Sequence, residues 1–240
     1  MARPRRRPSI NNSLNDNAMR LSFLLLAALL AIFTATAQQQ QWANDDPYYA
    51  RRVTHFATLP PITRGDIVFL GNSLTDGAEW NELLGNRHVK NRGIVGDIIQ
   101  GLIDRLDPIL DGQPKKLFIL SGVNDVSHDV DGDSIGRVME KLIVTVKRRC
   151  PKTKIYLQGM LPINNDFGRY RRLIGKEQVV LDGNRALEAV ARRQDVTWIN
   201  LFPLFANDEG KLRPDLTNDG LHLLGNGYLI WRDALKPYLK

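Results

Sequence analysis

Apolar and polar residues follow two different rhythms along this chain, and the two rhythms predict its secondary structure. Short runs of apolar, often β-branched residues are typical of strands buried on both faces. Such runs predict strands over residues 66–72, 88–92, 116–121, 154–158 and 196–201. Longer stretches with apolar residues three and four positions apart predict helices over about 76–85, 97–110, 134–149, 177–194 and 225–238. Because strands alternate with helices, we expect an α/β fold, a parallel sheet with helices on both faces and right-handed crossovers.

The same pattern divides the 240 residues into three parts. Residues 63–240 are predicted to form a single α/β domain, and a segment of this length is ordinary for one such domain. Residues 38–62 are polar, rich in Gln, Asp and Tyr, and predict a linker or N-terminal extension. Within the domain, the longest irregular segment is 159–176, directly after the fourth predicted strand. We expect this loop to be functional, since long loops at the carboxyl edge of a sheet commonly are.

Residues 1–37 have the pattern of a signal peptide. Arg20 precedes an apolar run over 21–33, and the run is followed by Ala35-Thr36-Ala37, a small-residue cleavage pattern. We therefore expect a periplasmic or secreted protein with no stable membrane anchor after cleavage; an uncleaved anchor is the alternative. Met19 with Arg20 resembles an ordinary signal-peptide start, so we interpret residues 1–18 as a mis-assigned upstream extension. A precursor shown by N-terminal mapping to begin before Met19 would refute that interpretation.

The charge and cysteine content exclude several classes of protein. The net charge of +7 comes largely from residues 1–37, which hold five Arg and one Asp. The remaining chain carries 28 basic and 25 acidic side chains. Charges that are so nearly balanced give no support for nucleic-acid binding. The single cysteine, Cys150, excludes an intramolecular disulfide, a Cys-rich zinc site and a CxxC redox pair.

One acidic segment has a spacing similar to that of a calcium-binding loop. Asp129, Asp131, Asp133 and Glu140 follow one another at short intervals, but Ser134 occupies the sixth position, where such a loop requires glycine. We interpret the segment as a loop and helix cap. We expect no metal and no cofactor in this protein.

The first predicted strand breaks at Gly71 into a small polar turn that carries Ser73. A serine at this point lies at the carboxyl edge of the sheet, where open α/β folds bind their ligands. Its hydroxyl can act as a nucleophile, and its own backbone N–H, at the start of a helix, can face developing negative charge. The alternative is that Ser73 only caps the following helix.

Near the C-terminus, Asp219 precedes His222 by three residues. At that spacing a carboxylate can accept a hydrogen bond from the imidazole and fix its tautomer, so that the other ring nitrogen can take a proton from a serine. The alternative is a helix-capping Asp and an ordinary helical His. The preceding Arg213-Pro214-Asp215 and the following Gly225 favour a tight loop over a regular helix.

Two further groups follow the second and third predicted strands. Gly96 ends a glycine turn and can present its backbone N–H to an anion without steric obstruction. Asn124, in Gly122-Val123-Asn124-Asp125, can donate a hydrogen bond from its side-chain amide. Each residue is also a common turn former, so neither is specific alone.

Together these four motifs resemble the four conserved blocks of the SGNH hydrolase superfamily, also called GDSL esterases and lipases. The blocks are Gly71-Asn72-Ser73-Leu74, Gly96 before Asp97, Gly122-Val123-Asn124-Asp125 and Asp219-Gly220-Leu221-His222. The resemblance spans about residues 65–235. It implies a three-layer α/β/α fold with a five-stranded parallel sheet in flavodoxin-like order.

The resemblance also implies a role for each residue. Ser73 is then the nucleophile, His222 the general base and acid, and Asp219 its orienting partner. The backbone N–H groups of Ser73 and Gly96 and the side chain of Asn124 form the oxyanion hole. Asn72 departs from the family pattern, since it stands where the GDSL signature has Asp. That Asp is not the relay carboxylate, so we expect activity to be retained.

Within the superfamily, residues 71–77 with Trp80, and residues 91–94, resemble secreted bacterial carbohydrate acetylesterases, including the sialate O-acetylesterase group. A more distant likeness is to platelet-activating-factor acetylhydrolase subunits. Both imply a short acyl group, most simply acetyl. We therefore expect a serine esterase that acts on an O-acylated carbohydrate.

The loop 159–176 contains candidate substrate contacts at Arg169, Arg171 and Arg172. Arginine binds carboxylates with two parallel hydrogen bonds, so these residues are candidates to recognise an acidic sugar. The alternative is that they are solvated surface charges. Two other functions stay open: a lipid-directed esterase or lysophospholipase, which would need an apolar rim, and a non-catalytic glycan-binding protein, which would need lost catalytic residues. The sequence does not predict the oligomeric state.

Overall fold

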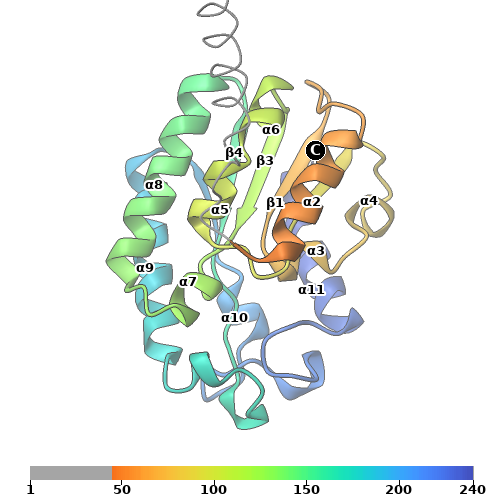
Figure 1. Ribbon diagram of the computed structural model, residues 1–240. Coiled ribbons are helices and arrows are strands. Elements are labelled where there is room, and N and C mark those ends of the chain that lie inside the picture. The colour runs from red at the N-terminus through yellow and green to blue at the C-terminus, as the bar shows by residue number, and fades with distance from the viewer. Residues whose placement is uncertain (1–44, 240) are drawn as a thin grey trace, which may run out of the picture. The chain divides into compact units, whose positions relative to one another are not determined.

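The computed structural model describes residues 45–239, so the predicted signal peptide and the start of the 38–62 segment lie outside the described residues. All five predicted strands are present: β1 (Ile67–Gly71), β2 (Val89–Gly93), β3 (Lys116–Leu120), β4 (Lys154–Gln158) and β5 (Thr197–Ile199). They form one parallel sheet in the order β2-β1-β3-β4-β5, and Figure 1 labels the three central strands β1, β3 and β4. This is the flavodoxin-like order that we expected. The strand order reverses between β1 and β3, which is where such sheets open a ligand crevice.

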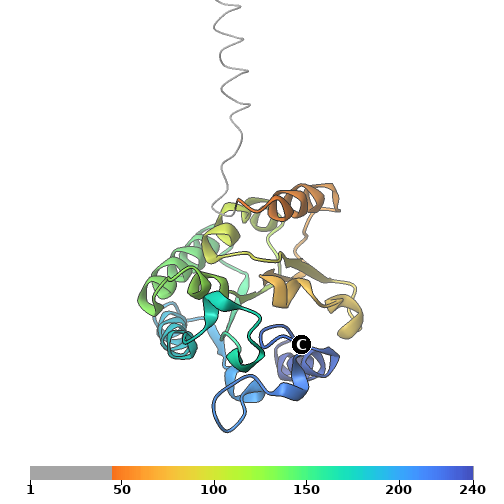
Figure 2. The same cartoon turned by 60° about the horizontal axis from the view of Figure 1, so that its bottom comes forward.

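Helices cover both faces of the sheet, because alternate strand residues point to opposite sides. Val68 and Leu70 of β1 belong to one apolar cluster, and Ile67 and Phe69 to a second. The first cluster is covered by α5 (Ile99–Asp104), α6 (Asp107–Asp111), α8 (Gly132–Arg149) and α9 (Glu177–Arg193). The second is covered by α4 (Trp80–Leu83), α10 (Phe202–Phe205) and α11 (Gly225–Leu235). The fold is therefore a three-layer α/β/α sandwich, and Figure 2 shows the two helical layers on either side of the strands.

An aromatic stack fills the second face. Phe69 lies between Trp80 and Phe118, with ring centroids 4.7 and 4.9 Å away, and Tyr156 stacks on Phe118 at 4.4 Å. The indole of Trp80 donates a hydrogen bond of 2.8 Å to the carbonyl oxygen of Thr75. Trp80, which the sequence placed downstream of the serine, is therefore a core residue that holds the turn after Ser73.

A helix occupies about half of the segment 38–62, which we expected to be a linker or N-terminal extension. Helix α2 (Pro47–Thr58) begins at the N-cap Asp46, whose side chain accepts a hydrogen bond from the backbone N–H of Tyr48. Tyr49 is fully buried, and its hydroxyl donates to the carbonyl oxygen of Gly101 in α5 at 2.7 Å. Of the two expectations, an N-terminal extension describes these residues better than a linker, because a buried tyrosine anchors the helix to the α/β domain.

The other differences are breaks in predicted helices. The stretch 97–110 forms α5 and α6 because Pro108, in the first turn of α6, cannot continue the hydrogen bonding of the preceding helix. The stretch 76–85 splits into α3 (Ser73–Asp76) and α4 at the C-cap Gly77. The last helix ends in a 3-10 turn, η4 (Lys236–Tyr238). The short helix α7 (Val123–Ser127) was not predicted as a helix. Helices α8 and α9 follow the sequence pattern closely.

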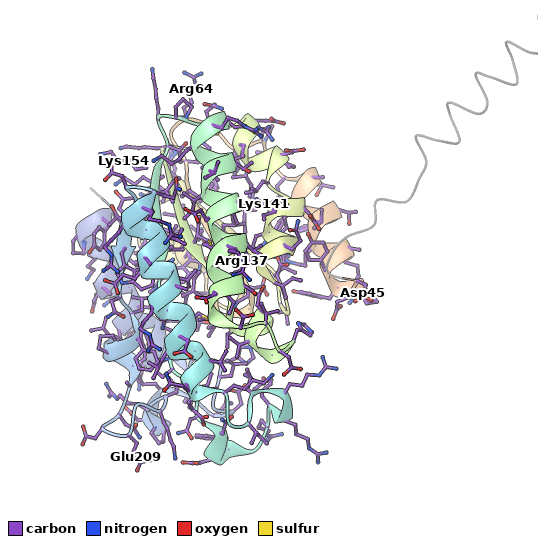
Figure 3. The ribbon with its side chains drawn as sticks, turned by 90° about the vertical axis from the view of Figure 1, so that its left-hand side faces the viewer. Asp45, Arg64, Arg137, Lys141, Lys154 and Glu209 are labelled. Atoms are coloured by element: carbon purple, nitrogen blue, oxygen red, sulfur yellow. The ribbon has the colours of Figure 1, made fainter. Side chains whose placement is uncertain are left out.

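Figure 3 views the molecule from the side of α8 and α9. Arg64 and Lys154, which lie close to the starts of β1 and β4, are at one end, and Glu209 is at the opposite end. Because the strands are parallel, the loops that follow them gather at the Glu209 end. Within residues 45–239, no helix has the length and apolar character needed to cross a membrane.

Candidate active site

Ser73 is the first residue of α3, immediately after the strand–turn junction of β1. The N-cap is Asn72, whose side-chain oxygen accepts a hydrogen bond from the backbone N–H of Leu74 at 3.1 Å. The hydroxyl of Ser73 lies instead 2.8 Å from Nε2 of His222, 149 residues later in the chain. The capping alternative for Ser73 is therefore wrong, because Asn72 fills that role.

Asp219 and His222 form the expected pair in a tight turn. Asp219 Oδ2 lies 2.8 Å from His222 Nδ1, while Oδ1 accepts the backbone N–H groups of Leu221 and His222 at 2.9 and 2.8 Å. Gly220 has φ +85°, and a Cβ there would lie 2.1 Å from the carbonyl oxygen of Asn164. Only glycine fits this position, and Asn164 N–H donates to the carbonyl oxygen of Gly220 at 2.8 Å.

The electrostatics of this turn keep Asp219 ionised. Partial burial acts to raise the pKa of Asp219, but the hydrogen bonds from the side chain and backbone of His222 and from Leu221 outweigh it and lower the pKa to about 2. An ionised carboxylate only accepts hydrogen bonds, so the proton between the two side chains is on His222 Nδ1. His222 Nε2 is then the acceptor for the hydroxyl of Ser73. The three side chains can move a proton away from the serine.

The two predicted oxyanion residues after β2 and β3 line the same surface hollow, about 480 Å³ in volume. Gly96 has φ +75°, a left-handed backbone that glycine adopts readily. Asn124 Nδ2 donates to the carbonyl oxygen of Asp97 at 2.9 Å. An amide nitrogen carries two N–H bonds, so this contact fixes the side chain and leaves a second N–H for another acceptor.

A buried ion pair holds the strand ends beneath these groups. Arg105 and Asp97 are almost fully buried, and the guanidinium and carboxylate lie 2.8 Å apart. The same guanidinium donates to the carbonyl oxygens of Arg92 at 2.8 Å and Gly71 at 3.1 Å. One arginine thus ties together the ends of β1 and β2 and the turn that contains Gly96.

Asp125 is a further buried acid at the site, and sequence reasoning gave it no role. It is 6% exposed and accepts the backbone N–H of Ile99, the first residue of α5, at 3.2 Å. Burial raises the pKa of Asp125 to about 7, against the lowering effect of the hydrogen bond from Ile99. Its position next to Asn124 was the only signal in the sequence, and that signal does not reveal burial.

Tyr170 is the second residue that the sequence did not single out. Its hydroxyl lies 3.0 Å from Asp219 Oδ2 and 3.0 Å from His222 Nδ1, and its ring meets the imidazole edge to face. Burial, followed by the hydrogen bond to Asp219, raises the pKa of Tyr170 to about 12. The sequence indicated only that its long loop was a candidate for function.

The three candidate arginines do not share one environment. Arg171 and Arg172 lie on η2 (Arg171–Leu173) and line a second hollow of about 500 Å³ together with Lys176. This hollow shares Ser127 and His128 with the hollow of Gly96 and Asn124, so the two adjoin. Arg169 is exposed and is not among the lining residues.

The acidic segment after α7 has protein partners. Asp131 is the N-cap of α8 and accepts the backbone N–H of Ser134 at 2.8 Å. Asp129 pairs with Lys176, and Glu140 pairs with Arg193. Among residues 45–239, no three His, Cys, Asp or Glu side chains are grouped so that they could hold a metal ion.

Comparison with known proteins agrees with this fold. The model of the GDSL-like lipase/acylhydrolase family matches residues 69–230. Platelet-activating factor acetylhydrolase IB subunit alpha1 of Homo sapiens is 27% identical over 169 residues, which are 68% of this chain and 70% of that protein. The N-acylneuraminate cytidylyltransferase of Escherichia coli is 27% identical over 184 residues, 73% of this chain and 40% of that protein. The solved structure of a GDSL-like lipase from Bacteroides thetaiotaomicron superposes with a TM-score of 0.69 at 25% identity, covering 79% of this chain and 96% of that one.

A parallel α/β sandwich with a serine, a histidine and a carboxylate at the carboxyl edge of its sheet defines a class of ester hydrolases. The chain belongs to the GDSL-like lipase/acylhydrolase family. It is a carboxylic ester hydrolase of the serine esterase kind.

Proposed function

We propose that this protein is an exported serine esterase that removes short acyl groups, above all O-acetyl groups, from carbohydrates such as sialic acid. The observation that carries the mechanism is the continuous hydrogen-bonded line from Ser73 through His222 to Asp219, with contacts of 2.8 Å at both steps. In such a line the hydroxyl is activated without a metal or a cofactor.

The reaction proceeds in two acyl-transfer steps. Ser73 Oγ attacks the ester carbonyl carbon while His222 Nε2 takes the hydroxyl proton. The backbone N–H groups of Ser73 and Gly96 and the amide of Asn124 stabilise the oxyanion. The imidazolium then protonates the departing alcohol oxygen and leaves an acyl-serine. Water attacks this ester, gives its proton to His222, and the carboxylic acid departs as the proton returns to Ser73 Oγ.

Three observations support a sugar as the alcohol component. The hollow beside Gly96 and Asn124 has several polar side chains in its lining, among them Asp125 and His128. Arg171 and Arg172 line the adjoining hollow, where they can form paired hydrogen bonds with a sugar carboxylate. One relative is named for N-acylneuraminate, an acidic sugar. The signal-peptide pattern of residues 1–37 supports export to the compartment where such glycans occur.

A second candidate is an acetylhydrolase that acts on a lipid. Several curated relatives are platelet-activating factor acetylhydrolase subunits. Val95, next to Gly96, is 45% exposed, and Ile174, which lines the hollow of Arg171, is 57% exposed. These two side chains would give a lipid some apolar contact. The polar residues around them favour the carbohydrate.

The test is acetate release by the purified protein from O-acetylated sialic acid, acetylated xylan, an acetylated phospholipid and a chromogenic acetate. Wild type, Ser73→Ala and the surface control Ser134→Ala are compared. We expect release from an acetylated sugar in wild type and Ser134→Ala, and none above background in Ser73→Ala. Acetate release from the phospholipid alone would refute a carbohydrate substrate and support an acetylhydrolase that acts on a lipid. No release from any ester would refute the catalytic roles and favour a glycan-binding protein.

Arginine variants test the sugar contact. Substitution of Arg171 or Arg172 by Gln should lower kcat/KM for the sialic acid ester more than for acetylated xylan, because only the former has a carboxylate. Arg169→Gln is the third variant of this series, at a position outside the lining residues. An equal effect on both substrates would exclude recognition of an acidic sugar. N-terminal sequencing of the exported protein tests cleavage after Ala37.

A further inference from the structure

We propose that Tyr170 is a positioning residue for the Asp219–His222 pair, and that its hydroxyl controls how strongly Asp219 supports the protonated imidazole. The proposal rests on the roles proposed above for Ser73, His222 and Asp219. Tyr170 Oη, Asp219 Oδ2 and His222 Nδ1 form a triangle with sides of 3.0, 3.0 and 2.8 Å. The hydroxyl thus lies beside the carboxylate oxygen that the imidazole also uses.

The donors in this triangle can be assigned from the charges. Asp219 is ionised at neutral pH, so Oδ2 can only accept. His222 Nδ1 carries a proton in the tautomer that leaves Nε2 open to Ser73. The one hydroxyl proton of Tyr170 therefore goes to Asp219 Oδ2, and an oxygen lone pair faces the Nδ1 proton. The phenol remains protonated throughout the range in which an esterase works, since burial and Asp219 raise its pKa to about 12.

This hydrogen bond has a directional effect on the reaction. The hydrogen bond from the hydroxyl to the charged Oδ2 is stronger than the contact of its lone pair with the Nδ1 proton. The net effect of the hydroxyl is therefore to stabilise the negative charge of Asp219 and to weaken the support that Asp219 gives to the imidazolium. Without the hydroxyl, Asp219 interacts more strongly with the protonated ring. His222 then holds its proton to higher pH and is available as a base only at higher pH. The titratable and charged groups that face the hydroxyl are Asp219, His222 and the nearby Arg169, whose charge acts on the phenol.

Tyr170 also joins the long loop to the catalytic turn. Its carbonyl oxygen accepts the backbone N–H of Leu173 at 2.9 Å within the turn that presents Arg171. Its ring lies edge to face with His222 at 5.6 Å between centroids. The same residue that contacts the triad therefore precedes the arginines that line the second hollow.

The test compares Tyr170→Phe with wild type and with the matched control Tyr156→Phe. Tyr156 loses the same hydroxyl, but its ring stacks on Phe118 within the second apolar cluster of the sheet. Two quantities are measured: kcat/KM for a chromogenic acetate against pH, and the NMR titration of the His222 ring proton. The chain has four histidines, and the His222 signal is assigned by its loss in His222→Asn.

In Tyr170→Phe we expect the acid limb of the profile and the titration midpoint of His222 to move to higher pH by about 0.3 to 1 unit. On the acid limb kcat/KM then falls about 2- to 10-fold, and Tyr156→Phe behaves as wild type. An unmoved limb and midpoint in Tyr170→Phe would overturn the proposal, as would the same movement in Tyr156→Phe. If the His222 midpoint moves in Tyr170→Phe but the wild type hydrolyses no ester, the positioning role stands and the proposed function is refuted.

Discussion

Asn124 donates a hydrogen bond from Nδ2 to the carbonyl oxygen of Asp97 over 2.9 Å. The contact joins α7, which follows β3, to the loop after β2, and these two segments also line one hollow through Asn124 and Gly96. It holds the amide in place before any substrate arrives. A donor that is already oriented needs no reorganisation as the oxyanion develops, which is why such donors are effective.

The first prediction concerns this amide. Asn124→Ala should lower kcat about 100-fold or more, with a smaller effect on KM, because the lost hydrogen bond is strongest in the transition state. Steady-state kinetics on a chromogenic acetate measure both constants. Asn81→Ala, at an exposed position on α4, is the control and should match wild type. A rise in KM with kcat unchanged would show that Asn124 binds ground-state substrate instead.

A second prediction concerns Asp219. Asp219→Asn should reduce kcat/KM about 10³- to 10⁴-fold, because the amide cannot hold His222 in the tautomer that accepts a proton from Ser73. The same kinetic assay measures this loss. Asp215→Asn removes an exposed carboxylate that pairs with Arg213 nearby in the chain and should retain wild-type activity. A loss of less than tenfold in Asp219→Asn would contradict the relay.

Gly220 carries the third prediction. Gly220→Ala places a Cβ 2.1 Å from the carbonyl oxygen of Asn164 at φ +85°, so the turn that holds Asp219 and His222 must shift. We expect a stability loss of about 2 kcal/mol or more and a drop in kcat/KM of at least about 100-fold.

Thermal unfolding and kinetics measure the two effects. Gly210 is the matched control, because it also has a positive φ, +75°, but has open space around the Cβ position. Gly210→Ala should cost about 1 kcal/mol and leave kcat/KM unchanged. Equal activity in the two variants would show that the close approach to Asn164 has no effect on the site.

The fourth prediction is a pH dependence of stability that originates at Asp125. Its pKa is raised to about 7 in the folded protein from an ordinary value near 3.8, so the folded state binds the extra proton. The stabilising contribution is complete below about pH 4 and is lost as the pH rises through about 7. Asp125→Asn, which stays neutral, should remove this dependence.

Chemical denaturation at pH 5 and pH 8.5 measures this pH dependence of the free energy of unfolding. Between these values the wild type should lose stability relative to Asp125→Asn by on the order of 2 kcal/mol. Asp208→Asn, at an exposed position, should follow wild type at both values. A constant difference between wild type and Asp125→Asn across the range would exclude titration of Asp125 in the folded state.

Much of the fold is readable in the chain because its signals are local. The β1 run of Ile67–Gly71 contains only apolar residues and a terminating glycine, and every residue of it is buried. Helices α8 and α9 are long enough for their apolar stripes to repeat several times. Helix α2 buries only Tyr49, so its sequence gives a weaker signal and predicts a linker or extension instead. Its position depends on contacts with distant segments: Tyr49 reaches α5, and Arg52 pairs with Asp76.

The sequence by itself determined the strand–helix alternation and singled out Ser73, Asp219 and His222 as candidates, because each belongs to a short motif with its own local geometry. Only the tertiary structure decided that Tyr170 lies against Asp219, 49 residues away, and that Asp125 is buried with a raised pKa. Contacts of this kind depend on where the ends of different strands meet in space. Burial likewise depends on every segment that covers a side chain, and no single stretch of sequence records it.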